Sequence, residues 1–155
     1  MPAEKLKKLL DENAIKYVSI NHSPAFTARE TAASTLVPRR EFAKTVIVNL
    51  DGQEAMAVVS ASRQVDVPAL VSLAGAEYGC LATEEEFTAN FADCEVGAMP
   101  PFGSLYNMRV FMDEMVSEVD DICFNAGSHA QIIRMECDDY KRLEQPVIGQ
   151  FAVKD

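Results

Sequence analysis

Basic residues are scarce in this sequence of 155 residues. It holds 14 lysines and arginines against 24 aspartates and glutamates, which gives a formal net charge of −10. Proteins that hold nucleic acid over a broad surface do so with many lysines and arginines. The charge balance therefore disfavours a broad electrostatic interface with nucleic acid, and any such contact is expected to be local and confined to a short piece.

Long apolar runs are also absent. No stretch approaches the roughly 20 apolar residues that cross a bilayer, and charges interrupt the apolar positions of the first ten residues, unlike a signal peptide. We therefore expect a cytoplasmic protein with no membrane segment. The length fits a single domain over residues 1–155, and 48% hydrophobic with 25% charged residues is ordinary for a globular domain.

Several common catalytic motifs are missing. There is no Gly-x-Ser-x-Gly nucleophile elbow, no GxxxxGK[ST] phosphate loop and no HExxH metal helix. The two histidines are isolated, and no CxxC pair occurs among Cys80, Cys94, Cys123 and Cys137. These absences predict neither a metal site nor a cofactor. They favour reduced structural thiols, although a nucleophilic role for any one of them stays open.

Helix-like and strand-like patterns alternate along the whole chain. Helical patterns cover residues 3–13, 27–36, 65–74, 83–91 and 138–144, and strand patterns cover 17–20, 43–50, 55–61, 77–82, 109–116, 121–125 and 130–135. The two strands that flank Asp51-Gly52 give the strongest hairpin signal. Because hairpin-length links dominate, the pattern predicts an α+β fold with a mixed, largely antiparallel sheet.

Two segments are candidates for binding or catalysis. Lys44 lies at the start of a strongly apolar strand, where its ammonium either reaches solvent or forms a fixed cation at the mouth of a pocket. The loop Gly97–Pro101 joins a glycine, which lets a ligand approach the main chain, to two adjacent prolines, which stiffen it. A rigid turn between two elements explains this loop equally well.

The third candidate is His129, which follows the Gly127-Ser128 turn between two predicted strands. A histidine in such a turn often bonds only to the backbone, but a neutral imidazole can also orient water or a substrate amine. On these residues alone the sequence indicates a pocket with a cation, a shaped loop and a histidine. They do not name a reaction.

Four segments, taken in their order along the chain, resemble the YbaK/prolyl-tRNA synthetase-associated editing family, and the resemblance covers nearly the whole chain. The matching segments are His22–Thr27, Ala43–Val48, Gly97–Gly103 and Asn125–His129. The resemblance implies a mixed sheet curled into a partial barrel with surrounding helices. It also implies a free-standing deacylase of mischarged tRNA that binds aminoacyl-tRNA by its acceptor 3′ end, with prolyl-tRNA synthetase as a candidate partner and with neither DNA nor a membrane.

The same resemblance assigns roles to particular residues. It implies catalytic roles for Lys44, Gly97 and His129, and substrate-binding roles for Thr45, Ala98, Met99, Pro100, Pro101, Gly127 and Ser128. Thr45 is typical of the YbaK and synthetase-insertion branches, whereas Pro101–Gly103 and His129 look closer to alanine-editing members. The leading substrates are therefore Ala-tRNA(Pro) and Cys-tRNA(Pro).

An aminoacyl ester is already activated, so we expect hydrolysis without a covalent intermediate. The site then has to place water and stabilise the oxyanion, with backbone N–H groups near Gly97 and Gly127 as expected donors. Two other function classes stay open. One is a non-catalytic module that captures aminoacyl-tRNA or a synthetase, since an acidic surface suits a basic partner. The other is a hydrolase of small aminoacyl esters, which the net charge does not disfavour.

Overall fold

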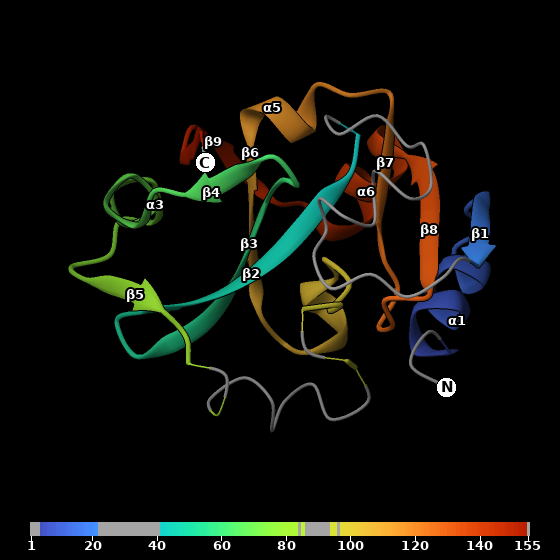
Figure 1. Cartoon of the computed structure of the whole chain (residues 1–155), viewed down its shortest axis with the longest axis horizontal. Helices are drawn as coiled ribbons and strands as arrows, with labels where there is room; N and C mark the ends of the chain where they lie inside the picture. Colours follow the sequence, from blue (N-terminus) through green and yellow to red (C-terminus); the bar gives the residue numbers. More distant parts are fainter. Residues whose placement is uncertain (1–3, 22–40, 84, 86–93, 96, 155) are drawn as a thin grey trace.

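The computed structural model describes residues 4–21, 41–83, 85, 94–95 and 97–154 (Figure 1). The predicted helix over 27–36, nearly all of the one over 83–91 and the segment His22–Thr27 lie outside the described residues. Within the described part, no helix is both long enough and apolar enough to cross a membrane.

Short helices and strands alternate through the described chain. The helices are α1 (Glu4–Glu12), α3 (Val67–Ala74), α5 (Glu114–Ser117) and α6 (Cys137–Glu144), with a 3-10 turn η1 (Gly103–Leu105). The strands are β1 (Tyr17–Asn21), β2 (Ala43–Leu50), β3 (Gln53–Ser60), β4 (Arg63–Val65), β5 (Gly79–Leu81), β6 (Arg109–Asp113), β7 (Asp121–Asn125), β8 (Gln131–Glu136), β9 (Val147–Gly149) and β10 (Ala152–Lys154).

These strands form three sheets. The largest has the order β5-β2-β3-β6-β9, a second has the order β1-β8-β7, and β10 pairs with β4. Five of the seven described pairings are antiparallel, and only β3–β6 and β6–β9 are parallel. The predicted α+β class with a mixed, largely antiparallel sheet is therefore confirmed. Among the described strands no ring closes, so the partial barrel stays a prediction.

The hairpin β2–β3 has the geometry that its Asp-Gly turn predicts. Asp51 and Gly52 both have positive φ, 51° and 87°, as a tight two-residue turn requires. The N–H of Gly52 donates to Asn49 Oδ1 at 2.9 Å. The Asp51 carboxylate also accepts the N–H groups of Glu77 and Tyr78, each 3.0 Å from Oδ1. One aspartate thus shapes the turn and ties it to the segment that leads into β5.

Two predicted elements end differently in the structure. The strand predicted over 109–116 stops at Asp113, whose side chain accepts from Met115 N at 3.1 Å and begins α5. The helix predicted over 65–74 begins at Val67, because Asp66 caps it through Ala69 N at 3.2 Å. In both places a carboxylate accepts a backbone N–H and sets where the helix begins, although the apolar pattern predicts a different boundary. The short strands β4, β9 and β10 were not predicted.

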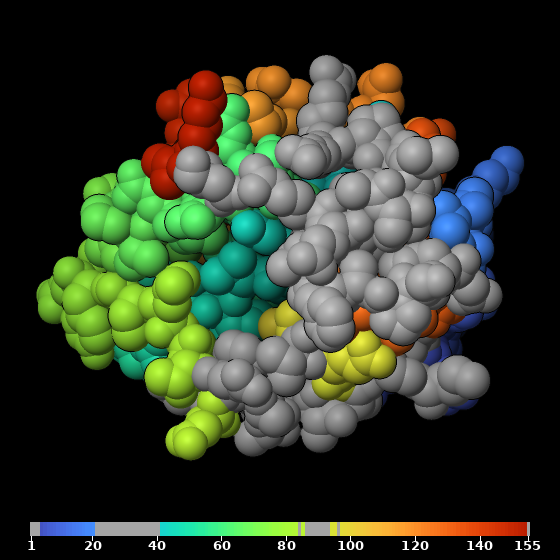
Figure 2. Space-filling view, viewed as in Figure 1, coloured from blue at the N-terminus to red at the C-terminus, as the bar shows by residue number. Residues whose placement is uncertain are grey.

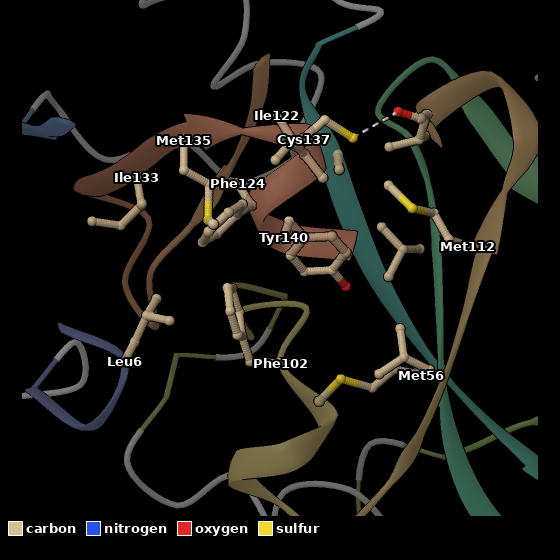
Figure 3. Packing of buried hydrophobic residues seen from close by; sticks show 14 of the residues in the cluster. Leu6, Met56, Phe102, Met112, Ile122, Phe124, Ile133, Met135, Cys137 and Tyr140 are labelled. Atoms are coloured by element: carbon tan, nitrogen blue, oxygen red, sulfur yellow. Dashed lines mark hydrogen bonds between the residues drawn. The ribbon is translucent and has the colours of Figure 1, made fainter. Parts of the chain in front are cut away.

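Figure 1 shows the central strands β2, β3 and β6 with α3 on one side and the β1-β8-β7 sheet with α1 on the other. The main core fills the space between the two sheets. Figure 3 shows Phe102 and Tyr140 pointing toward one another in that core, and their ring centroids are 5.2 Å apart at an angle of 88°. Phe102 also packs on Phe124, with centroids 5.4 Å apart. Its buried ring therefore anchors the end of the loop that begins at Gly97.

Gly103 permits the close approach that follows this anchor. A β-carbon on Gly103 would lie 2.2 Å from the carbonyl oxygen of Met108 and 2.6 Å from Val110 Cγ2. Its own carbonyl accepts the N–H groups of Tyr106 and Met108 at 3.0 and 2.9 Å. The motif glycine is thus required by backbone packing rather than by a ligand.

Candidate active site

The loop that begins at Gly97 and the turn that carries His129 are joined by main-chain hydrogen bonds. Gly127 N donates to Ala98 O at 2.8 Å, and Glu95 N donates to Gly127 O at 2.8 Å. Glu95 O in turn accepts from Ala98 N at 3.0 Å. Two segments that are about thirty residues apart in the sequence therefore form one hydrogen-bonded unit, which we call the clamp (residues 95, 97–98 and 127–129).

Side-chain contacts complete the clamp. Glu95 Oε2 accepts from His129 N at 2.9 Å, and Oε1 lies 3.4 Å from Ser128 Oγ. Ser128 Oγ also accepts from Ala130 N at 3.1 Å. Sequence reasoning missed Glu95, because nothing in the pattern separates it from the many acidic residues that are simply solvated.

The clamp places the predicted catalytic residues Gly97 and His129 side by side. A β-carbon on Gly97 would lie 3.5 Å from Cε1 and 3.7 Å from Nε2 of the His129 imidazole. Gly97 is exposed and has a φ of 82°, a conformation that glycine adopts at little cost. The imidazole therefore faces backbone that carries no side chain, at a distance where one added carbon would be in van der Waals contact with the ring.

The other residues of the predicted loop lie inside the protein. Ala98 and Met99 are 0% and 5% exposed, and Pro100 and Pro101 are also buried. The carbonyl of Pro101 accepts a hydrogen bond from the buried hydroxyl of Tyr140 at 2.5 Å. These residues fix the shape of the loop, and direct contact between their side chains and a substrate stays a prediction.

Lys44 lies half-buried near the start of β2, next to β7. Phe42, just before β2, bridges Cys123 of β7 in parallel, and Cys123 N donates to Glu41 O at 2.8 Å. Because side chains alternate along a strand, Lys44 shares the face of Phe42, and Asn125 shares the face of Cys123. Lys44 and Asn125 are thus on one face of neighbouring strands, and the turn that carries His129 follows Asn125 directly.

Figure 2 shows that the β2–β3 hairpin (teal) and the segment after residue 94 (yellow) both reach the surface on the same face of the molecule. Thr45 points the other way from Lys44, toward the core face of Ala43 and Ile47. The structure therefore does not bring Thr45 and Lys44 to the same face.

Asn125 is a polar side chain that sequence reasoning did not assign. It is 4% exposed, and within the described part of the chain its Oδ1 has no hydrogen-bond partner. A buried acceptor without a donor is unfavourable by about 1–3 kcal/mol. Asn125 is therefore a candidate to receive a donor from a ligand.

The backbone donors expected near Gly127 have other partners. The N–H groups of Gly127, Ala98 and His129 all donate within the clamp, to Ala98 O, Glu95 O and the Glu95 carboxylate. These three donors hold the two segments together, and the expectation of oxyanion donors among the other N–H groups near Gly97 and Gly127 stays a prediction.

Two of the four thiols are unsuited to nucleophilic attack. Burial raises the pKa of Cys123 to about 12, and it also raises the pKa of Cys137. Both thiols are fully buried, and they hold their protons at neutral pH. Cys80 is exposed, and Cys94 Sγ lies 3.3 Å from the hydroxyl of Tyr106. Among the described residues, no group of three histidine, cysteine, aspartate or glutamate side chains is close enough together to hold a metal ion.

One hollow in the described surface lies away from the clamp. It has a volume of about 440 Å³ and is lined by Leu50, Gln53, Glu54, Ala55, Tyr106, Asn107, Met108 and Arg109. Leu50 and Gln53 flank the hairpin turn, at the opposite end of β2 from Lys44. Because the hollow lies at that end of β2, we assign it no part in the chemistry of the clamp.

Comparison with known proteins identifies relatives of the whole chain. A profile of the aminoacyl-tRNA editing domain matches residues 22–143. The multifunctional Ser/Thr-tRNA deacylase ProXp-y of Escherichia coli strain K12 is 25% identical over 153 residues, which cover 96% of this chain and 91% of the relative.

Two solved structures share the fold. A hypothetical protein, APE2540, aligns with a TM-score of 0.87 at 20% identity, over 97% of this chain and 100% of that chain. A candidate trans-editing enzyme for prolyl-tRNA synthetase aligns with a TM-score of 0.81 at 19% identity, over 99% of this chain and 97% of that chain. At these identities the likeness establishes the architecture.

Proposed function

Because this chain belongs to the aminoacyl-tRNA editing domain family and is an aminoacyl-tRNA hydrolase, we propose that it acts in trans, as a single domain over residues 1–155, on mischarged tRNA in the cytoplasm. The observation that carries the proposal is the clamp, which holds the His129 imidazole against the exposed main chain of Gly97. A site of this kind takes a small ligand that enters beside the ring, as the acceptor end of a tRNA would.

The chemistry that we propose is direct attack of water on the aminoacyl ester. Lys44 binds the terminal adenosine end or the charge that develops on the carbonyl oxygen, where a fixed cation is most effective. His129 orients the water or the substrate amine. Gly97 keeps the space in front of the imidazole open. The proposal uses no metal, cofactor or covalent intermediate.

Serine and threonine are the amino acids that we propose first. The E. coli relative is named as a Ser/Thr-tRNA deacylase. The buried Oδ1 of Asn125, on the face of Lys44, also accepts a donor such as a substrate hydroxyl or ammonium group. A site built to bond a hydroxyl discriminates strongly against a substrate that lacks one, because its polar group is then left unpaired.

Ala-tRNA(Pro) and Cys-tRNA(Pro) are the second candidates. The resemblance of Pro101–Gly103 and His129 to alanine-editing members favours them, and a structural neighbour is a candidate trans-editing enzyme for prolyl-tRNA synthetase. Under this alternative, prolyl-tRNA synthetase is the expected partner, and the amino acid is selected by size rather than by a hydroxyl.

The test is deacylation of tRNAs aminoacylated with Ser, Thr, Ala, Cys or Pro, including each of these on tRNA(Pro), by wild type and by Lys44→Ala. We expect hydrolysis of at least one non-cognate pair and a loss of about 100-fold or more in Lys44→Ala, the size of effect that follows removal of one charge-stabilising group. Lys16→Ala, which removes an exposed lysine just before β1, is the matched control and should retain wild-type activity.

Each outcome separates the candidates. Hydrolysis restricted to seryl and threonyl esters supports the first substrate class, and hydrolysis of alanyl or cysteinyl esters on tRNA(Pro) supports the second. Equal turnover of small aminoacyl esters and aminoacyl-tRNA would instead indicate a general esterase. Binding of aminoacyl-tRNA without any turnover would replace the enzyme with a binding module.

A further inference from the structure

Glu95 binds the turn that carries His129 through both its main chain and its side chain. Its N–H donates to Gly127 O at 2.8 Å, and its carboxylate accepts from His129 N at 2.9 Å. We propose that Glu95 is a positioning residue for the hydrolysis described above: acting through the main chain of His129, it holds the imidazole opposite Gly97. This inference rests on the proposed function and adds a residue to its site.

The physical basis is the placement of these bonds. The N–H that Glu95 holds belongs to the same residue as the imidazole, so a shift of the turn is carried directly to the ring. A displacement of about 1 Å at a reacting group can lower a rate about 100-fold.

The geometry favours positioning over direct contact with the substrate. One oxygen of the Glu95 carboxylate faces His129 N and the other faces Ser128 Oγ, so both are directed at the turn. A counter-ion for a substrate ammonium would instead present its charge to the ligand. The two roles make different demands, since positioning needs an acceptor of the right length whereas a counter-ion needs the negative charge.

The test compares Glu95→Ala, Glu95→Gln, His129→Ala and the double variant Glu95→Ala/His129→Ala on the aminoacyl-tRNA that wild type hydrolyses. Glu77→Ala removes an exposed glutamate between α3 and β5 and is the matched control. We expect Glu95→Ala to lower kcat about 10- to 100-fold with KM changed less than about threefold. Glu95→Gln keeps an acceptor oxygen and should retain kcat within about threefold.

The double variant decides whether Glu95 acts through His129. If it does, the double variant is no slower than His129→Ala alone, because the residue that Glu95 positions is already gone. If the fold-losses of Glu95→Ala and His129→Ala multiply in the double variant, the proposal is overturned. It is also overturned by a Glu95→Gln variant as impaired as Glu95→Ala with a raised KM, which is the signature of a counter-ion.

Amide hydrogen exchange at His129 tests the clamp without any substrate. Exchange should be slow in wild type and in Glu95→Gln, and faster in Glu95→Ala, with the rest of β7 and β8 unchanged. If wild type hydrolyses no aminoacyl-tRNA, the proposed function fails on its own. If the amide of His129 exchanges at the same rate in wild type and in Glu95→Ala, that result separately overturns the positioning role.

Discussion

At the scale of single residues, burial decides which thiols can react. Cys123 and Cys137 are fully enclosed, and Cys137 Sγ also donates to the carbonyl of Val116 at 3.6 Å. Cys80 is exposed on β5. The sequence left a nucleophilic role open for any of the four thiols, and the structure makes the two enclosed ones structural.

We predict that a thiol reagent labels Cys80 in the native protein and reaches Cys123 and Cys137 only after unfolding, as mass spectrometry of the labelled protein can show.

The pKa of Cys123 is about 12 when folded and about 9 in its ordinary state. The unfolded thiol therefore ionises first, and the free energy of unfolding should fall as the pH rises from about 9 toward 12. Cys123→Ala should show a shallower fall, and an equal slope in both proteins would contradict this account.

At the scale of elements, Asp113 joins three parts of the chain. It is 5% exposed at the end of β6, its Oδ2 caps α5, and its Oδ1 accepts from Phe151 N and Ala152 N at 3.0 and 3.1 Å. This carboxylate both ends the strand that the sequence predicted to continue and ties β10 to the large sheet.

We predict that Asp113→Ala lowers the free energy of unfolding by about 2–4 kcal/mol, because three backbone N–H groups lose their acceptor. Denaturant unfolding followed by circular dichroism measures the change. Asp120→Ala, which removes an exposed aspartate after α5, should differ from wild type by less than about 0.5 kcal/mol. A loss of the same small size for Asp113→Ala would show that solvent replaces the carboxylate.

At the scale of the whole molecule, charge limits how the protein can hold its substrate. A net charge of −10 disfavours broad contact with a polyanion, so binding depends on cations that are fixed locally. The proposed site offers Lys44 as one such cation, at the start of β2. Recognition is therefore expected to depend on the acceptor end rather than on the body of the tRNA.

We predict a weak salt dependence of tRNA binding. With one or two phosphate contacts, raising the salt from 50 to 200 mM should raise KM by less than about tenfold, whereas a protein that makes many phosphate contacts loses a thousandfold or more. Steady-state kinetics over this range measure the slope. A steep loss would reveal a basic surface that the overall charge conceals.

The sequence by itself determined the fold class and most of the elements. Hydrophobic periodicity and turn chemistry are local signals, so they predicted β2, the Asp51-Gly52 turn, β3 and the strands β7 and β8 close to their observed bounds. The same signals pointed to Gly97 and His129, which the structure does place side by side. They failed where a single carboxylate redirects the backbone, as at Asp66 and Asp113.

Only the tertiary structure decided which distant residues meet. The hydrogen bonds of Glu95 to the turn at 127–129 cross more than thirty residues, and no periodicity encodes them. The parallel bridge between Phe42 and Cys123 decides that the side chain of Asn125, with its buried Oδ1, shares a face with Lys44. Local patterns set what each segment is, whereas packing of the two sheets sets which side chains share a site, because that packing depends on the whole chain at once.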